Sequence, residues 1–326
     1  MSKRIVPSIV FYEAFDEEAR VLQTLFKPEH HVRFTPKAIQ ESGDNELPST
    51  LISIRTQSVI PPSWAPTLKG VLSRSTGYDH LVAFRERTSC AAALGYLEEY
   101  STRAVAEHAL LMVLALLRKL PLQVRQLPMF QRDGLTGVEL KGRRVLVVGV
   151  GRIGGEIVRL ASALGCDVKG VDIKPDNAGV TYVSKEMGIE WAEVIVCAMN
   201  LTRENTGYFS YDLLRRARQG TVFVNIARGE HAPLTHLGQL LAEGHLGAIG
   251  LDVFEDEALL AAALRDPAAH SSPFVPTLRK LLASPNVLFT PHNAFNTREA
   301  LTRKCAMTVA QIEHFLKQGR FQWQIP

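Results

Sequence analysis

The turn Gly149-Val150-Gly151-Arg152-Ile153-Gly154 follows directly after the apolar run Val145–Val148. A helical pattern comes after the turn, and Asp172 ends the next apolar run. In this layout the first glycine permits the turn, the second lets the backbone approach a pyrophosphate, and the third lets the helix pack on the strand. The free N–H groups of the helix N-terminus face the phosphates. The segment therefore predicts a strand–turn–helix–strand unit that binds a dinucleotide.

The chain beyond residue 143 alternates between short apolar strands and helical segments. Buried strands joined by helices imply a parallel, doubly wound sheet, because parallel neighbours need crossover connections. Ligands bind beyond the C-terminal ends of such strands. We expect strands at Arg144–Val150, Asp167–Asp172, Glu193–Ala198, Thr221–Asn225, Ala248–Val253 and Val287–Thr290, and helices at Ile153–Leu164, Tyr211–Arg218 and Leu234–Glu243.

The first hundred residues show a second alternation of strands and helices. A length of 326 residues favours about two domains, each with its own core. We therefore expect an α/β protein with two doubly wound parallel-sheet domains. The expected strands are Ile5–Tyr12, His31–Phe34, Leu51–Ile54, Gly70–Ser73 and Thr88–Ala92. Glu13–Phe26 and Pro62–Leu68 are expected to form helices or helical turns, and a final helix, Thr297–Gln318, is capped by Asn296 or Thr297.

Composition excludes several classes of protein. The net charge is only +4 and no run of five basic residues occurs, so no electrostatic footprint for nucleic acid is present. The four cysteines form no C-x-x-C pair and no Cys/His cluster, which favours a reducing compartment, the cytoplasm, and no metal site. Pro7 and Glu13 interrupt the first apolar stretch, so no signal peptide is expected. Ala104–Leu120 contains Glu107 and His108 and predicts a buried or interface helix, with no membrane span.

Polar side chains follow three of the expected strands. Arg228 comes after Thr221–Asn225, an acidic segment that includes Glu257 comes after Ala248–Val253, and His292 comes after Val287–Thr290. Each has an ordinary interpretation when taken alone: a solvated turn arginine, an exposed loop acid and a structural histidine. Their order and their shared place at the strand ends favour a catalytic arginine–glutamate–histidine set.

With these residues in place, the chain resembles the D-isomer-specific 2-hydroxyacid dehydrogenases over almost its full length. Further matching segments are Arg74–His80 and Tyr100–His108. The segment between Glu257 and Val287 resembles the D-lactate dehydrogenase branch. The chain departs from the family pattern at Ala258 in place of proline, at Ala232-Pro233 in place of Val-Asp, at Val82 in place of aspartate, and at Gly95–Glu99 before Tyr100.

The resemblance implies a domain organisation and an assembly. Residues 1–100 with 293–326 would form a flavodoxin-like substrate domain, and residues 101–292 would form a Rossmann domain that binds NAD. The active site would lie in a cleft between the two domains. The helix Ala104–Leu120 would pair with its copy in a homodimer.

The resemblance also implies residue roles, and the chemistry is consistent with them. Arg228 would bind the substrate carboxylate and polarise its carbonyl group. His292 would donate or remove the proton, and Glu257 would favour the charged imidazole and fix the ring. Substrate contacts would come from Arg55, Thr56, Thr76, Gly77 and Tyr100. Cofactor contacts would come from Gly149, Gly151, Arg152, Ile153, Gly154, Asp172, Cys197, Asn200, Thr206, Ile226, Ala227, Asp252 and Ala294, although Cys197 alone is typical of a core residue and Asp252 of a capping acid.

The expected activity is reversible hydride transfer between NADH and a small 2-oxo acid, with pyruvate and D-lactate as the first candidates. Hydroxypyruvate or glyoxylate is the alternative substrate. Asp172 favours NAD over NADP because a carboxylate repels a 2′-phosphate, although the nearby Lys174 softens that repulsion. A dinucleotide-sensing protein, such as the transcriptional corepressors built on this fold, is the alternative function.

Overall fold

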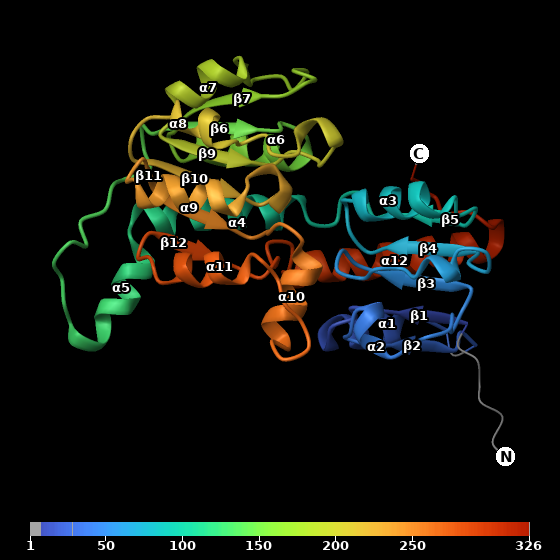
Figure 1. The fold of residues 1–326 in the computed structure, drawn as a ribbon. Coiled ribbons are helices and arrows are strands. Elements are labelled where there is room, and N and C mark those ends of the chain that lie inside the picture. Colours follow the sequence, from blue (N-terminus) through green and yellow to red (C-terminus); the bar gives the residue numbers. More distant parts are fainter. Residues whose placement is uncertain (1–7, 28, 326) are drawn as a thin grey trace. The chain divides into compact units, whose positions relative to one another are not determined.

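The computed structural model describes residues 8–27 and 29–325, and these form two compact units (Figure 1). Unit 1 contains the described residues up to Ser101 together with those from Asn296 onward, and unit 2 is Thr102–Phe295. Each unit contains one sheet, of five and of seven strands, and all paired strands within each sheet run parallel. The predicted α/β class with two doubly wound sheets is confirmed.

Unit 1 is built on the strand order β2-β1-β3-β4-β5. The chain adds β2 on one side of β1 and then adds β3, β4 and β5 on the other side, so the strand order switches between β1 and β3. Ligands bind at this switch point in such a topology. Helix α12 packs against α1 and β4, so the last helix of the chain completes the first unit (Figure 1). The elements are β1 (Ile9–Phe11), α1 (Asp16–Leu25), β2 (Val32–Phe34), α2 (Ile39–Ser42), β3 (Leu51–Ile54), η1 (Pro62–Trp64), β4 (Gly70–Ser73), α3 (Asp79–Thr88), β5 (Ala93–Gly95) and α12 (Arg298–Gln318).

One element of unit 1 differs in kind from the sequence-based expectation. The strand expected at Thr88–Ala92 is wrong: Thr88 ends α3, where its hydroxyl donates to the Phe84 carbonyl oxygen at 2.7 Å, and β5 begins at Ala93. The helix ends because Ser89 adopts a left-handed backbone with φ of 53°. Pro62–Leu68 contains only the 3₁₀ turn η1. The expected strand Ile5–Tyr12 begins outside the described residues, and β1 occupies Ile9–Phe11 within it.

Unit 2 is built on the strand order β12-β11-β10-β9-β6-β7-β8, which reverses between β6 and β9. Helix α4 packs against α6 and against β10, β11 and β12. The strands are β6 (Arg144–Val148), β7 (Asp167–Val171), β8 (Thr181–Tyr182), β9 (Val194–Cys197), β10 (Thr221–Asn225), β11 (Leu246–Leu251) and β12 (Val287–Phe289). The helices are α4 (Thr102–Leu117), α5 (Leu120–Gln126), η2 (Leu127–Met129), α6 (Arg152–Ala163), α7 (Lys185–Trp191), η3 (Arg203–Asn205), α8 (Tyr211–Arg215), η4 (Gly229–His231), α9 (Leu234–Ala242), α10 (Glu257–Arg265) and α11 (Val275–Leu282).

The register of the seven-stranded sheet brings the strand ends into one row. Val148 pairs with Val171 and Cys197, Asn225 pairs with Cys197 and Leu251, and Leu251 pairs with Phe289. The next residues along the chain are the glycine-rich turn, Asp172 and the segments that carry Arg228, Asp252 and His292. Residues widely separated in sequence therefore share one edge of the sheet.

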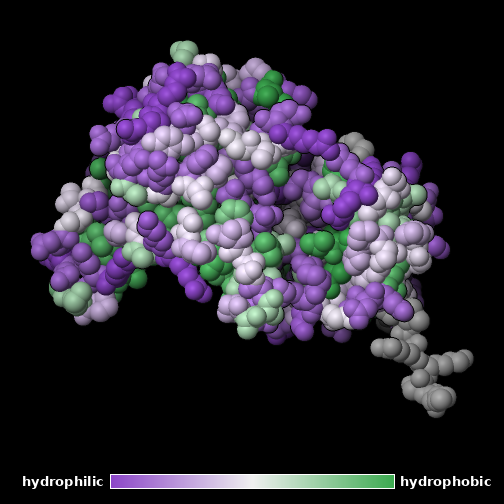
Figure 2. All heavy atoms as spheres, in the orientation of Figure 1, coloured by the Kyte–Doolittle hydropathy of each residue, from purple (hydrophilic) through white to green (hydrophobic). Residues whose placement is uncertain are grey.

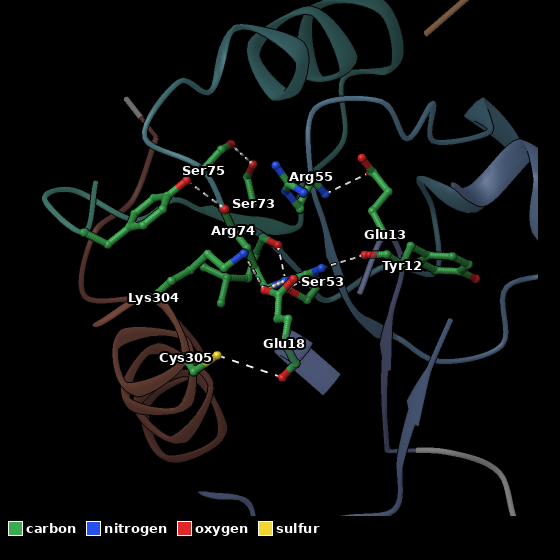
Figure 3. Close-up of polar contacts among 12 residues, drawn as sticks. Tyr12, Glu13, Glu18, Ser53, Arg55, Ser73, Arg74, Ser75, Lys304 and Cys305 are labelled. Carbon is green, nitrogen blue, oxygen red and sulfur yellow. Dashed lines mark hydrogen bonds and ion pairs between the residues drawn. The ribbon is translucent and has the colours of Figure 1, made fainter. Parts of the chain in front are cut away.

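A buried charge cluster holds α1, β4 and α12 of unit 1 together (Figure 3). Glu18 Oε1 accepts hydrogen bonds from Arg74 Nε at 2.8 Å and from Lys304 Nζ at 3.0 Å. None of the three side chains is more than 1% exposed. Burial opposes ionisation of Glu18, but the charges of Arg74, Lys304 and Arg55 outweigh it and lower its pKa to about 2. Burial lowers the pKa of Lys304 to about 8 in spite of Glu18.

Within the cluster, Glu18 provides the negative charge that balances the buried cations Arg74 and Lys304. We expect Glu18→Gln to lower the free energy of unfolding by roughly 3–5 kcal/mol, because it leaves buried cations without their counter-charge. Lys304→Met should cost less at neutral pH, since burial already disfavours the charged ammonium. Urea unfolding curves measure both changes, and Glu17→Gln, on the exposed neighbouring residue, is the matched control.

The same cluster makes the stability of unit 1 depend on pH in the acid range. The pKa of Glu18 is lowered from 4.5 to about 2, so its contribution is present above pH 4.5 and is lost as the pH falls from 4.5 towards 2. An unfolding free energy of Glu18→Gln that falls as steeply as wild type over this range would contradict the assignment.

Candidate active site

The glycine-rich turn has a separate steric reason for each of its three glycines. Gly149 adopts φ of +89°, and a Cβ there would lie 2.6 Å from the Met199 nitrogen. A Cβ on Gly154 would lie 1.8 Å from the Gly149 carbonyl oxygen, so helix and turn pack too closely for any side chain. A Cβ on Gly151 would meet nothing within 4 Å. The fold itself therefore requires Gly149 and Gly154, whereas Gly151 leaves open space in front of the turn.

The N-terminus of α6 and the carboxylate of Asp172 flank that open space. Gly151 is the N-cap of α6 and has no side chain to cap the helix, and a helix N-terminus favours an anion. Asp172 Oδ2 accepts from the Val150 nitrogen at 2.5 Å, and Oδ1 accepts from the Lys174 nitrogen at 2.9 Å. These contacts tie the end of β7 to the turn after β6. An uncapped helix N-terminus, an open glycine and an acid one strand away fit NAD.

The loop after β10 carries Arg228 and is fixed by Asn225. The Asn225 amide donates to the Arg228 carbonyl oxygen at 2.7 Å and accepts from the Ala227 nitrogen at 3.0 Å. A Cβ on Gly229 would lie 1.9 Å from the Phe254 carbonyl carbon, so the loops after β10 and β11 pack backbone against backbone. Arg228 itself is half-buried, and its Nη1 donates to the Ala227 carbonyl oxygen at 2.8 Å.

His292 and Glu257 form a hydrogen-bonded pair. Both carboxylate oxygens of Glu257 lie 2.8 Å from His292 Nδ1, and each side chain is 19% exposed. Glu257 is the first residue of α10, where the helix dipole favours a negative charge. The contact holds the imidazole from its Nδ1 side. The sequence placed both residues in one site, and the structure brings them into direct contact.

Asp252 organises the turn that carries His292. Its Oδ1 accepts from the Thr290 hydroxyl at 2.5 Å and the Asn293 nitrogen at 2.8 Å, and its Oδ2 accepts from the Ala294 nitrogen at 2.9 Å. Its carbonyl oxygen accepts from the His292 nitrogen at 2.8 Å. Strand β11 ends at Leu251, two residues earlier than expected, so Asp252 and Val253 lie in the loop. The Asp252 side chain is thus occupied by the turn.

One of the predicted cofactor residues, Cys197, lies in the core of unit 2. Cys197 is 0% exposed, and its Sγ lies 3.6 Å from Nδ1 of the equally buried His231. Burial raises the pKa of its thiol to about 12. Its side chain therefore packs in the core, and a cofactor contact from Cys197 stays a prediction.

The other predicted cofactor residues lie at or near the same edge. Arg152 and Ile153 begin α6, and Ile226 and Ala227 follow β10 with little exposed surface. Asn200 and Thr206 are exposed in the loop around η3, where Asn205 Nδ2 donates to the Asn200 carbonyl oxygen at 2.7 Å. Ala294 is buried beside Asp252.

The predicted substrate residues all lie in unit 1, after β3, β4 and β5. Arg55 follows β3, and its guanidinium lies 5.0 Å from the centre of the Phe15 ring. The loop that starts with Arg55 and Thr56 is fixed by Glu13, whose carboxylate accepts from the Arg55 and Ser58 nitrogens.

The Thr76–Gly77 loop after β4 is held by neighbouring polar groups. Thr76 donates to the Glu98 carbonyl oxygen at 3.3 Å, and Ser75 donates to the Gly77 carbonyl oxygen at 2.7 Å. Tyr100 is buried and donates to the Arg74 carbonyl oxygen at 3.5 Å.

Several residues that shape the site were not singled out from the sequence. Asn225 and Thr290 are polar positions at the ends of apolar strands, which is the signal that could have found them. His108 is a histidine in a largely apolar helix that also contains Glu107. Glu255 accepts from the Leu234 nitrogen at 2.7 Å, so it caps α9, where Pro233 stands instead of the usual aspartate.

Comparison with known proteins identifies the family. The model for the NAD-binding domain of D-isomer-specific 2-hydroxyacid dehydrogenases matches residues 110–294. A 2-hydroxyacid dehydrogenase homolog of Schizosaccharomyces pombe is 30% identical over 257 residues, which is 76% of each chain. The chain belongs to the D-isomer-specific 2-hydroxyacid dehydrogenases. The resemblance noted in the sequence is therefore confirmed.

Further relatives of this dehydrogenase include D-lactate dehydrogenases. That of Escherichia coli is 31% identical over 225 residues, 67% of each chain. The crystal structure of D-lactate dehydrogenase from Aquifex aeolicus with NAD and lactic acid is similar at a TM-score of 0.84 and 25% identity, over 96% of this chain and 98% of that one. Membership makes the chain an oxidoreductase of CH–OH groups and confirms NAD as the cofactor of its family domain. Among the described residues, no helix is long and apolar enough to cross a membrane.

The second and third glycines of the turn, Gly151 and Gly154, separate cofactor binding from folding. We expect Gly154→Ala to lower the melting temperature, because its Cβ would overlap the Gly149 carbonyl oxygen. Gly151→Ala should leave the melting temperature nearly unchanged but weaken NADH binding about tenfold, equal to ~1.4 kcal/mol, because the methyl group fills the space for the pyrophosphate. Thermal melts and NADH fluorescence titrations measure the two effects. Unaltered NADH affinity in Gly151→Ala would contradict this position for the pyrophosphate.

Proposed function

We propose that this dehydrogenase transfers a hydride reversibly between NADH and a small 2-oxo acid, with NAD preferred over NADP. The observation that carries the proposal is the contact between His292 Nδ1 and the Glu257 carboxylate at 2.8 Å. This pair lies at the same edge of the sheet as the glycine-rich turn and Arg228. An acid–base pair, a cation and a dinucleotide turn are the groups that this reaction needs.

His292 is the proton donor and acceptor in this proposal. Its Nδ1 bears a hydrogen and donates it to Glu257, which leaves Nε2 as the atom that exchanges a proton with the substrate oxygen. The contact with the carboxylate fixes the ring from its Nδ1 side. In oxidation the neutral ring accepts the proton of the hydroxyl group, and Glu257 stabilises the imidazolium that forms.

Arg228 binds the substrate. Bound NADH supplies the hydride, and negative charge then develops on the carbonyl oxygen of the 2-oxo acid. A guanidinium binds a carboxylate through two parallel hydrogen bonds and stabilises the developing charge. The Asn225 amide and the close packing of Gly229 on Phe254 fix the loop from which Arg228 extends.

Pyruvate is the first candidate substrate, with D-lactate as its product. Relatives named D-lactate dehydrogenase, and one solved with NAD and lactic acid, support this choice. In unit 1 we propose the backbone of Thr76 and Gly77, with Arg55, Thr56 and Tyr100, as substrate contacts. A substrate role for Arg55 would favour a substrate with a second polar or anionic group, such as hydroxypyruvate or oxaloacetate. Hydroxypyruvate or glyoxylate is the alternative to pyruvate.

A dinucleotide-sensing protein is the second candidate function. The glycine-rich turn and Asp172 serve a sensor as well as an enzyme, so they do not separate the two. Glu257 and His292 separate them, because a sensor has no need for a proton donor held by a carboxylate.

A second copy of the chain is the proposed partner. Apolar side chains are exposed along α4, α5 and the segment after them, and Figure 2 shows hydrophobic surface where Figure 1 labels α5. They are Leu111, Leu114, Leu120, Val124, Leu127, Met129, Phe130 and Val138.

All four cysteines are free, which supports the reducing cytoplasm as the compartment.

A substrate screen tests the proposal. Purified protein is assayed for oxidation of NADH and of NADPH with pyruvate, hydroxypyruvate, glyoxylate and oxaloacetate, and for reduction of NAD with both enantiomers of lactate. We expect turnover with at least one 2-oxo acid and with the D enantiomer only. Tight binding of NADH without turnover of any substrate would favour the sensor and refute the enzyme.

The acid–base pair gives two measurable effects. His292→Ala should lower kcat by roughly 10²–10⁴-fold while NADH still binds, which is the usual share of general acid–base catalysis. Glu257→Gln should lower kcat of reduction with the NADH dissociation constant unchanged, because the imidazole loses the carboxylate that holds its Nδ1 side. The exposed His270→Gln is the control for the histidine. An unchanged kcat in Glu257→Gln would remove Glu257 from the mechanism.

Asp172 gives the cofactor preference. We expect kcat/KM to be higher with NADH than with NADPH, because the carboxylate accepts hydrogen bonds from ribose hydroxyls and repels a 2′-phosphate. Asp172→Ser should narrow that ratio, chiefly through KM. The Asp172→Ser variant also loses the contact to the Val150 nitrogen. Lys174→Ala keeps that contact and changes only the charge near Asp172, so it should widen the preference for NADH. A wild-type enzyme that is equally efficient with NADPH would overturn the preference.

A further inference from the structure

His108 lies on α4, outside every role assigned so far, and contacts the loop that leads to His292. Its Nε2 lies 3.1 Å from the Thr290 hydroxyl oxygen and 3.7 Å from Asp252 Oδ1. The side chain is 17% exposed, on a helix that packs against β10, β11 and β12. It therefore contacts the end of the strand from which His292 is presented.

The direction of each hydrogen bond follows from the donors available. Asp252 Oδ1 lies 2.5 Å from the Thr290 oxygen, and an ionised carboxylate can only accept, so the single hydroxyl proton of Thr290 points at Asp252. The Thr290 oxygen then accepts from His108 Nε2. This arrangement needs a hydrogen on Nε2 only, so it holds for both the charged ring and one neutral tautomer.

The other end of this chain of hydrogen bonds encloses His292. Asp252 accepts from the nitrogens of Asn293 and Ala294 through its carboxylate, and from the His292 nitrogen through its carbonyl oxygen. His292 has φ of +51°, a left-handed backbone that a residue with a side chain adopts only when its surroundings enforce it. The hydrogen bonds to Asp252 hold the backbone of His292 in this conformation.

We propose that His108 is a positioning residue for the acid–base step. Through Thr290 and Asp252 it fixes the left-handed turn of His292 and thereby keeps the imidazole against Glu257. Its kinetic consequence rests on the proposed function, whereas its structural consequence, the contact between His292 and Glu257, does not.

The kinetic experiment compares variants that remove the donor or hydroxyl with variants that keep one. His108→Leu and Thr290→Val should each lower kcat about fivefold to tenfold, the scale of one lost buried hydrogen bond, with the NADH dissociation constant within about twofold of wild type. The double variant should be no slower than either single one, because both break the same chain. His108→Gln and Thr290→Ser should recover most of kcat. The exposed His270→Gln is the control and should match wild type.

A second readout does not depend on activity. In protein labelled with ¹⁵N-histidine, the Nδ1 proton of His292 held by Glu257 gives a downfield resonance, which is assigned by its absence from His292→Asn. His108→Leu should weaken or shift that resonance, and His108→Gln should restore it.

The outcomes separate this inference from the proposed function. An unchanged His292 resonance in His108→Leu would overturn the inference, whether or not the wild type reduces 2-oxo acids. Loss of kcat that His108→Gln does not recover, with equal loss of NADH binding and melting temperature, would also overturn it by showing a structural role alone. Wild-type inactivity on all 2-oxo acids, with the resonance behaving as expected, would refute the proposed function and leave the positioning role supported.

Discussion

The parallel register of the seven-stranded sheet is the constraint on which the candidate site depends. Parallel strands that start and stop together must deliver the loops after them to one edge, because each crossover returns the chain to the same starting side. Here Val148, Val171, Cys197, Asn225, Leu251 and Phe289 end in register. The sheet therefore gathers a phosphate turn, an acid, an arginine and a histidine without long loops. Three glycine positions, 149, 154 and 229, allow those short loops to touch backbone to backbone.

Each unit contains a buried carboxylate, and the two carboxylates are stabilised by different kinds of partner. In unit 2, Asp252 is 1% exposed and its carboxylate is satisfied by neutral donors, two backbone N–H groups and a hydroxyl. In unit 1, Glu18 is equally buried and is balanced by cations, Arg74 and Lys304, with one oxygen left without a hydrogen-bond partner. Neutral donors fix the direction of a backbone turn, which suits the loop that holds His292. A charge cluster resists removal of any one partner, which suits the joining of α1, β4 and α12.

Sequence reasoning worked where local chemistry and long-range packing agree. Thr221–Asn225, Leu51–Ile54 and Gly70–Ser73 were predicted with their observed bounds, because each is a short apolar run that stays buried. Thr297 caps α12 through its hydroxyl, as the sequence predicted. The strand predicted at Thr88–Ala92 is wrong, because β-branched residues such as Thr88 favour strands but also occur at helix ends. In the structure Thr88 ends α3, and its hydroxyl donates to the Phe84 carbonyl oxygen. The full burial of Cys197 could not be predicted from the sequence, because it depends on the neighbouring strands and on His231, which lies 34 residues away.

The sequence by itself determined the fold class, the dinucleotide turn and the family, because these depend on local patterns: apolar periodicity, glycines at fixed spacing, and the order of arginine, glutamate and histidine. Tertiary structure alone decided which groups touch. It alone shows that both oxygens of Glu257 lie against His292 Nδ1, that Asp252 is occupied by a turn, and that His108 of α4 contacts Thr290 after β12. These contacts join residues 35 to 182 positions apart. Hydrogen bonds act over about 3 Å, and only the packing of helices on the sheet brings such distant residues within that range.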